Sequence, residues 1–178
     1  GPSEGMSNPI LVVDIGNTGS TLGLYRAGRI EQRSHCESAA GVEAEAVRSL
    51  AGGLQVAGAV AGSVVPELNA NWRRAVEQVC GTAPLFVDCG LELGVAIDYP
   101  HPEQIGADRL ANACAASERF GHPVVVADFG TALTFDVVSA AGTYVGGVIA
   151  PGLPLMFDYL AEKTALLPHV KPGPTENR

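Results

Sequence analysis

The sequence predicts an α/β protein made of two related lobes around one cleft. Two observations lead to this prediction. A short apolar strand that runs into an Asp-x-Gly turn with threonines occurs twice, at residues 11–18 and again at residues 124–134. Each copy is followed by a second strand, an Ala-Gly turn at 27–28 or 141–142, and a third strand. This repetition is typical of an internal duplication in which each half presents an acidic, glycine-rich loop.

The composition is that of a turn-rich protein with room for a hydrophobic core. The chain has 178 residues, of which 47% are hydrophobic and 22 are glycine, and its formal net charge is −8. This charge argues against nucleic acid or an anionic membrane as the main partner. The apolar runs are too short to span a membrane. Residues 1–6 are interpreted as a tag remnant, and no signal peptide is visible. The four cysteines lack C-x-x-C spacing and are interpreted as free thiols of a reducing compartment.

The first half is expected to alternate strands and helices. A strand at 10–14, the loop at 14–20 and a hairpin lead to a weak helix at 41–50. The small apolar residues at 56–65 are typical of a buried parallel strand. Pro66 opens a helix that Gly81 ends, and its apolar stripe predicts core packing around Trp72. A short strand at 83–88 follows.

The second half begins with an irregular stretch. Two prolines stiffen the loop at 98–109, and a helix at 107–120 starts after Gly106 and ends at Gly121. The apolar run at 124–127 predicts a buried strand. A further strand at 144–152 is expected to be broken by its paired glycines, and a helix is expected at 153–164. The proline-rich tail is expected to be a loop.

The two Asp-Gly loops predict a site for a polyphosphate and its metal. Glycine-rich turns direct backbone N–H groups at phosphate oxygens without needing lysine, and the sequence has only two lysines. Asp14 and Asp128 are suited to hold Mg²⁺ or its waters through oxygen ligands. The chain has no G-x-x-x-x-G-K-[ST] pattern, which excludes a P-loop. We therefore expect ATP to lie between the two loops.

A phosphoryl transfer also needs a general base and residues that bind the acceptor. Asp108, in the first turn of a helix, is the predicted base, since the helix N-terminus favours a carboxylate there. Arg109 is suited to bind a carboxylate on the acceptor through paired hydrogen bonds. Tyr99, on the stiff approach loop, either covers the acceptor or is a half-buried loop aromatic. Asp98, Glu103 and Asp136 are rival carboxylates, and Asp136 is expected to face solvent or a neighbouring strand.

These residues resemble a known family. DIGNT at 14–18, GSVVP at 62–66, Tyr99 with GADR at 106–109, DFGTALT at 128–134 and GGVIAPG at 146–152 are similar to the motifs of type III pantothenate kinases, in the same order. The resemblance implies the fold of the acetate kinase, sugar kinase, heat-shock ATPase and actin superfamily. That fold has two actin-like (ribonuclease H-like) lobes around a nucleotide cleft, which here would span residues 7–104 and 105–178.

The resemblance also implies a function and a set of site residues. The activity would be ATP-dependent phosphorylation of pantothenate, the first step of coenzyme A synthesis, by a cytoplasmic homodimer. Asp108 would accept the proton, and Asp128 would hold K⁺ or NH₄⁺ rather than Mg²⁺. The residues implied to hold ATP and its metal are Asp14, Ile15, Gly16, Asn17, Thr18, Gly19, Ser20, Thr21 and Thr131. The residues implied to bind pantothenate are Tyr99, Gly106, Ala107, Asp108 and Arg109.

The resemblance has one departure, which concerns length. Family members are longer, so the second lobe is expected to lack its C-terminal part here. A threonine of a later motif completes the substrate site in the family, and Thr175 lies near the expected region. The alternative hypothesis is a regulatory protein that keeps the fold and binds nucleotide with weak or no turnover. ATP binding without phosphate transfer would distinguish the alternative from the kinase.

Overall fold

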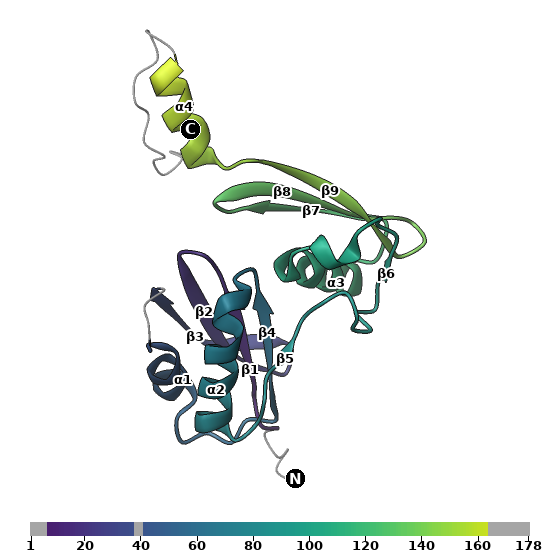
Figure 1. Ribbon diagram of the computed structural model, residues 1–178. Coiled ribbons are helices and arrows are strands. Elements are labelled where there is room, and N and C mark those ends of the chain that lie inside the picture. The colour runs from purple at the N-terminus through teal and green to yellow at the C-terminus, as the bar shows by residue number, and fades with distance from the viewer. Residues whose placement is uncertain (1–6, 38–40, 164–178) are drawn as a thin grey trace, which may run out of the picture. The chain divides into compact units, whose positions relative to one another are not determined.

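The computed structural model describes residues 7–37 and 41–163 of the chain (Figure 1). The chain divides into two compact units. The first unit contains residues up to Glu92 together with Glu103–Ala111, and the second contains Leu93–Pro102 and the residues from Asn112 onward. Each unit holds one β-sheet. The lobe boundary predicted between residues 104 and 105 remains a prediction.

The first unit is a five-stranded sheet with two helices. Its strands lie in the order β3-β2-β1-β4-β5. The strand bounds are Ile10–Ile15 for β1, Gly19–Arg26 for β2, Arg29–Glu37 for β3, Gly58–Ser63 for β4 and Leu85–Phe86 for β5. The helices are α1 at Glu43–Ala51, the 3₁₀ turn η1 at Pro66–Leu68 and α2 at Asn69–Cys80. The predicted parallel strand at 56–65 is confirmed, because β4 pairs in parallel with both β1 and β5.

The core of this unit lies between the sheet and its helices. Leu11, Val13 and Ile15 of β1 alternate inward and are at most 4% exposed, as the period of a half-buried strand requires. They pack in one cluster with α1 and α2, and the predicted core residue Trp72 is 2% exposed. Gly81 ends α2 with a φ of 70°, the left-handed conformation that glycine adopts without strain. The outward positions of β1, including Asp14, lie on the opposite face.

The second unit is a four-stranded sheet in the order β6-β9-β8-β7. The bounds are Ala96–Ile97 for β6, Val124–Phe129 for β7, Ala132–Val138 for β8 and Thr143–Pro151 for β9. The prediction that paired glycines break the last strand is wrong, since β9 runs through both of them. Gly146, with a φ of 110°, instead lies opposite a register shift in β8, so the glycine accommodates a bulge.

Two helices and one 3₁₀ turn lie between residues 102 and 163. The 3₁₀ turn η2 spans Pro102–Gln104, α3 spans Ala107–Phe120 and α4 spans Leu153–Lys163. The prediction of a helix at 107–120 is confirmed at both ends. From Asn112 onward α3 belongs to the second unit and lies along one face of its sheet (Figure 1). The proline-rich tail and Thr175 lie outside the described residues.

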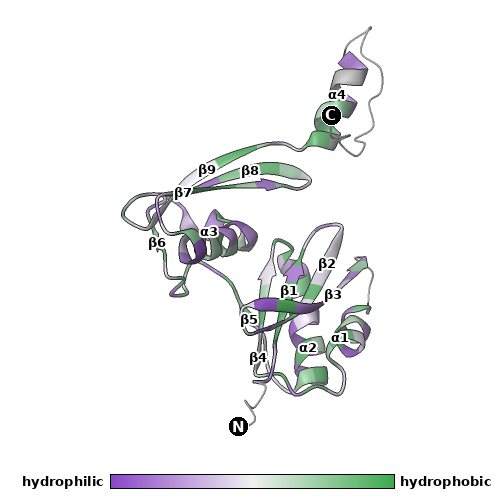
Figure 2. Cartoon of the chain, turned by 180° about the vertical axis from the view of Figure 1, so that it is seen from behind, coloured by the Kyte–Doolittle hydropathy of each residue, from purple (hydrophilic) through white to green (hydrophobic). Residues whose placement is uncertain are grey.

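The two sheets share a plan, which confirms the repeat seen in the sequence. β1-β2-β3 and β7-β8-β9 are both antiparallel meanders that begin with an Asp-Gly loop. In the first sheet β4 pairs with the outer edge of β1, whereas within the described residues β7 has no strand on its outer edge. The prediction of a buried strand at 124–127 is therefore wrong: Val125 is 61% exposed. It shares its sheet face with Phe129 and Val148, which are 68% and 61% exposed, and apolar residues colour β8 and β9 green in Figure 2.

Within the described part of the chain, no helix combines the length and apolar character needed to cross a bilayer.

Candidate functional site

The first Asp-Gly loop joins β1 to β2. Asp14 is exposed one residue before the end of β1, and its cross-strand partner is Thr21. The backbone N–H of Gly16 donates to the carbonyl of Gly19 over 3.0 Å, which closes the turn. A Cβ on Gly16 would lie 2.9 Å from that same carbonyl, so the tight turn requires glycine. Asn17 and Thr18 are exposed at the tip, where their hydroxyl and amide groups are available to a ligand.

The second Asp-Gly loop repeats this arrangement with one residue fewer. Asp128 is exposed one residue before the end of β7, and its cross-strand partner is again a threonine, Thr134. The N–H of Gly130 donates to the carbonyl of Ala132 over 2.9 Å. In both hairpins, therefore, the carboxylate sits at the strand end beside a threonine, with a closed glycine turn next to it. Such turns leave backbone N–H groups at the loop surface, where they can bind anions.

Gly152 packs directly against the backbone of this second loop. It is buried and immediately precedes α4. A Cβ built on it would collide with the carbonyl of Thr131 and lie 2.7 Å from the carbonyl of Gly130. The final glycine of the GGVIAPG segment therefore allows the loop that carries Thr131 to rest directly on the backbone. The sequence alone does not reveal this contact.

The predicted base lies in the first turn of α3. The N–H of Leu110 donates to the carbonyl of Gly106, so Gly106 immediately precedes the helix and accepts its first hydrogen bond. One carboxylate oxygen of Asp108, Oδ1, accepts the N–H of Arg109 over 2.9 Å, and the side chain is exposed. The same oxygen lies 2.5 Å from the point that a Cβ on Gly106 would occupy. Glycine at this position thus lets the carboxylate fold back over the helix start.

Within the first unit, Asp108 and Asp14 lie at the same end of the sheet. Asp14 is the register partner of Gly62 on the neighbouring parallel strand β4. Ala107 packs against Gly62, whose Cβ, if present, would lie 3.8 Å from that of Ala107. The helix start therefore adjoins the carboxyl ends of β1 and β4, where ligands bind in open α/β sheets. Asp128 belongs to the second unit, and its convergence with Asp14 stays a prediction.

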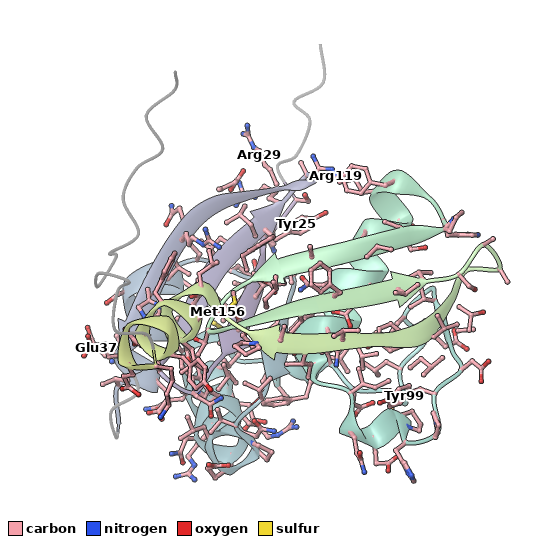
Figure 3. The ribbon with its side chains drawn as sticks, turned by 90° about the horizontal axis from the view of Figure 1, so that it is seen from above. Tyr25, Arg29, Glu37, Tyr99, Arg119 and Met156 are labelled. Carbon is pink, nitrogen blue, oxygen red and sulfur yellow. The ribbon has the colours of Figure 1, made fainter. Side chains whose placement is uncertain are left out.

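Tyr99 lies in the second unit on the loop that follows β6 (Figure 3). Its ring lies 3.2 Å from the position of a Cβ on Gly146, so the ring packs on the bare backbone of β9. The tyrosine is 42% exposed. It is therefore a fixed aromatic with an accessible side, rather than a fully covered loop residue. This arrangement fits a platform for a small acceptor.

Of the two alternatives predicted for Asp136, solvent or a neighbouring strand, the structure shows the neighbouring strand. Asp136 is 0% exposed, and its Oδ1 accepts a hydrogen bond from the Tyr144 hydroxyl over 2.8 Å. Tyr144 lies on the neighbouring strand β9, and is itself 1% exposed. A carboxylate this deeply covered is a poor proton acceptor for a ligand from solution. The structure therefore favours Asp108 over Asp136 as the base.

Three polar residues near the loops were not singled out from the sequence. Arg33 lines a cavity of about 190 Å³ on the outer face of the first sheet, together with Asp14 and Thr21. His35 Nδ1 and the Thr21 hydroxyl form a hydrogen bond of 3.2 Å. On α3, the Asn112 side chain donates to Asp128 Oδ2 over 3.0 Å. The sequence did contain a signal for Arg33 and His35. They are two residues apart on β3, and a strand places such residues on one face, here the face of Asp14.

The carboxylates of the site are dispersed. Among residues 7–37 and 41–163 no group of three or more His, Cys, Asp or Glu side chains is arranged to hold a metal ion. Asp128 offers one carboxylate, and its cross-strand partner Thr134 carries a hydroxyl. A single charge among neutral oxygens suits a monovalent cation, whereas Asp14 suits Mg²⁺ that is also held by phosphate oxygens. Which ion each carboxylate holds stays a prediction.

Comparison with known proteins adds to this geometry. Residues 10–177 match the type III pantothenate kinase family. The chain is 43% identical over 162 residues to a type III pantothenate kinase of Akkermansia muciniphila, and 37% identical over 180 residues to one of Koribacter versatilis. These matches cover 91% and 90% of the chain but 65% and 66% of the relatives, so the chain spans just under two thirds of their length.

A solved structure is similar in fold. A Campylobacter jejuni protein described as a Baf family transcriptional activator superposes with a TM-score of 0.54 at 17% sequence identity, over 87% of this chain and 61% of that one. The likeness at this identity concerns the fold alone. The family match and the curated relatives carry the assignment further, and the chain belongs to the type III pantothenate kinase family.

Proposed function

We propose that this chain forms the catalytic framework of an ATP-dependent kinase that phosphorylates the primary hydroxyl of pantothenate to give 4'-phosphopantothenate. This is the first step of coenzyme A biosynthesis. The observation that carries the proposal is the exposed Asp108 carboxylate at the start of α3, beside the β4 strand that pairs with Asp14. A phosphate loop and a base at one end of one sheet are what a phosphoryl transfer to an alcohol needs.

The two Asp-Gly loops bind ATP in this proposal. Backbone N–H groups at the exposed tip, residues 17–18, and the Thr18 hydroxyl receive phosphate oxygens, and Thr131 contacts the nucleotide from the other loop. Ser20, predicted to bind ATP, is 3% exposed, so its hydroxyl is not offered to the nucleotide. Asp14 holds Mg²⁺ or its waters. Arg33, which lines the cavity shared with Asp14, supplies positive charge beside this loop in a sequence with only two lysines. These residues neutralise the charge of the transferred group.

Asp108 acts as the general base. Arg109 N–H holds Oδ1, so Oδ2 is the oxygen that takes the proton from the pantothenate hydroxyl. The Arg109 side chain pairs with the pantothenate carboxylate, and Tyr99 covers the acceptor on the surface that Gly146 supports. Asp128 holds K⁺ or NH₄⁺. The cation, when bound, supplies fixed positive charge near the phosphates.

Three further properties belong to the same proposal. The protein works in the cytoplasm, and it forms a homodimer in which a threonine from a later part of the chain completes the pantothenate site. These rest on membership of the family and on the resemblance of the site motifs. The regulatory alternative is not favoured by any contact within the described residues, and it becomes an outcome of the experiment.

A coupled assay of ADP release tests the function, with pantothenate, ATP, Mg²⁺ and KCl. Mass spectrometry of the product identifies phosphopantothenate directly. We expect turnover that depends on pantothenate and that Asp108→Asn nearly removes while ATP still binds. ATP binding by calorimetry without any phosphorylated product would support the regulatory alternative instead. Turnover with another alcohol and none with pantothenate would assign a different substrate.

A further inference from the structure

One side-chain contact reaches the proposed cation ligand from the neighbouring helix. Asn112 Nδ2 on α3 donates a hydrogen bond to Asp128 Oδ2 at the end of β7, and the distance is 3.0 Å. Both residues belong to the second unit, so the contact is internal to one compact body. It joins residues 16 positions apart in the sequence. The contact fixes one of the two oxygens of the carboxylate.

Asparagine is an unexpected residue in this helix. The sequence from Ala111 to Ala116 is otherwise rich in alanine, the best helix former. Asparagine favours caps and turns, because its side chain competes for backbone hydrogen bonds. Asn112 lies in the helix interior and is half-buried. Its local cost to the helix is offset by a contact outside the helix, and that contact is the one to Asp128.

The chemistry of the donor also matters. A lysine or arginine at this place would neutralise Asp128 and compete with a bound cation. The neutral amide orients the carboxylate and leaves its full negative charge, and Oδ1 remains available. Asp136 lies on the same sheet face as Asp128, diagonally across on β8. Side chains in this diagonal relation generally have Cβ atoms about 7 Å apart. That second carboxylate is likewise held by a neutral donor, the Tyr144 hydroxyl.

We propose that Asn112 is a positioning residue that orients Asp128 for a monovalent cation and so sets the affinity of that site. The inference rests on the proposed function, in which Asp128 holds K⁺ or NH₄⁺. Partners of this kind orient the ligands of many metal sites, and their loss typically lowers metal affinity about 10–100-fold. Asn112 acts through Asp128 and does not contact the reacting atoms.

The experiment measures cation binding as well as turnover. The melting temperature is recorded with a non-hydrolysable ATP analogue while KCl replaces choline chloride at constant ionic strength. The variants are Asn112→Leu, which keeps the size and removes the donor, Asn112→Ala, and Asn112→Gln, which restores an amide. Ser117→Ala is the matched control, because it removes another side-chain contact of α3, to His122.

We expect the K⁺ concentration for half-maximal stabilisation to rise about tenfold in Asn112→Leu and Asn112→Ala. It should return toward the wild-type value in Asn112→Gln and stay unchanged in Ser117→Ala. The K⁺ concentration for half-maximal turnover should follow the same order. Unchanged K⁺ dependence in a folded donor-free variant would overturn the inference, as would a wild type that K⁺ does not stabilise. Because the thermal measurement needs neither pantothenate nor turnover, absence of pantothenate phosphorylation would refute the proposed function alone.

Discussion

Because Gly152 packs against the second Asp-Gly loop, we predict that adding one methyl group there, in Gly152→Ala, destabilises the protein. In Gly152→Ala the new Cβ would collide with the carbonyl of Thr131 and lie 2.7 Å from that of Gly130. Real Cβ atoms essentially never approach another heavy atom closer than 3.0 Å. Both obstacles are backbone atoms, which cannot rotate away as a side chain can. The loop or the start of α4 must therefore move.

The cost follows from measured effects of overpacking. Inserting a methyl group into a closed site costs about 1–3 kcal/mol. For a protein of this size each kcal/mol lowers the melting temperature by about 2–4 °C, so the expected fall is about 2–12 °C. The displaced loop carries Thr131, so the apparent Michaelis constant for ATP should rise as well. Thermal unfolding and a titration of ATP in the coupled assay measure the two effects.

Gly130→Ala is the matched control within the same loop. A Cβ on Gly130 would lie 3.6 Å from the Ala132 carbonyl, an ordinary van der Waals distance. Stability should therefore stay close to that of the wild type, and any loss should appear only in ATP binding. If Gly152→Ala melts like the wild type and binds ATP equally well, the loop can move at no cost to make room for the methyl group. That result would refute the reasoning.

Three other predictions concern the base, the aromatic platform and the thiols. Asp108→Asn should lower kcat about 10²–10⁴-fold without lowering the melting temperature, since the side chain is exposed; wild-type rates would remove it from the role of base. Gly146→Ala should displace the Tyr99 ring and raise the Michaelis constant for pantothenate more than that for ATP; equal changes would argue against the platform. Burial raises the pKa of the Cys36 and Cys80 thiols above the ordinary value. Above about pH 8.5 the unfolded chain loses thiol protons that the folded chain keeps, so the free energy of unfolding should fall as pH rises past that value. Urea unfolding at pH 7.5 and 9.5 should show a smaller fall in the Cys36→Ala, Cys80→Ala double variant.

Local signals in the sequence predicted the helices well. Glycines at 106 and 121 flank α3, and its predicted limits are those observed. Gly81 ends α2 in the expected left-handed conformation. Both cases depend on residues within one turn of the boundary, where backbone preferences act directly. The duplication was equally visible, because each half repeats the same order of strand, loop and hairpin.

The errors arose where distant residues decide the outcome. The apolar run of β7 was expected to be buried, but burial depends on what pairs with its edge and covers its face. For Asp136 the sequence left solvent and a neighbouring strand open, and only the contact with Tyr144 on β9 decides for the strand. The contact of Asn112 with Asp128 joins a helix to a strand. Sequence periodicity reports the face of an element, not the partner it meets.

Among residues 7–37 and 41–163 no strand pairs with the outer edge of β7, and this affects how that part of the chain behaves in solution. A strand with unpaired amide and carbonyl groups next to water-exposed valine and phenylalanine readily recruits another extended chain. A polypeptide limited to residues 7–163 would therefore tend to self-associate as its concentration rises, and light scattering would detect this before activity declined. Purification at low concentration, or co-expression with a segment that supplies an adjoining strand, would counter this tendency.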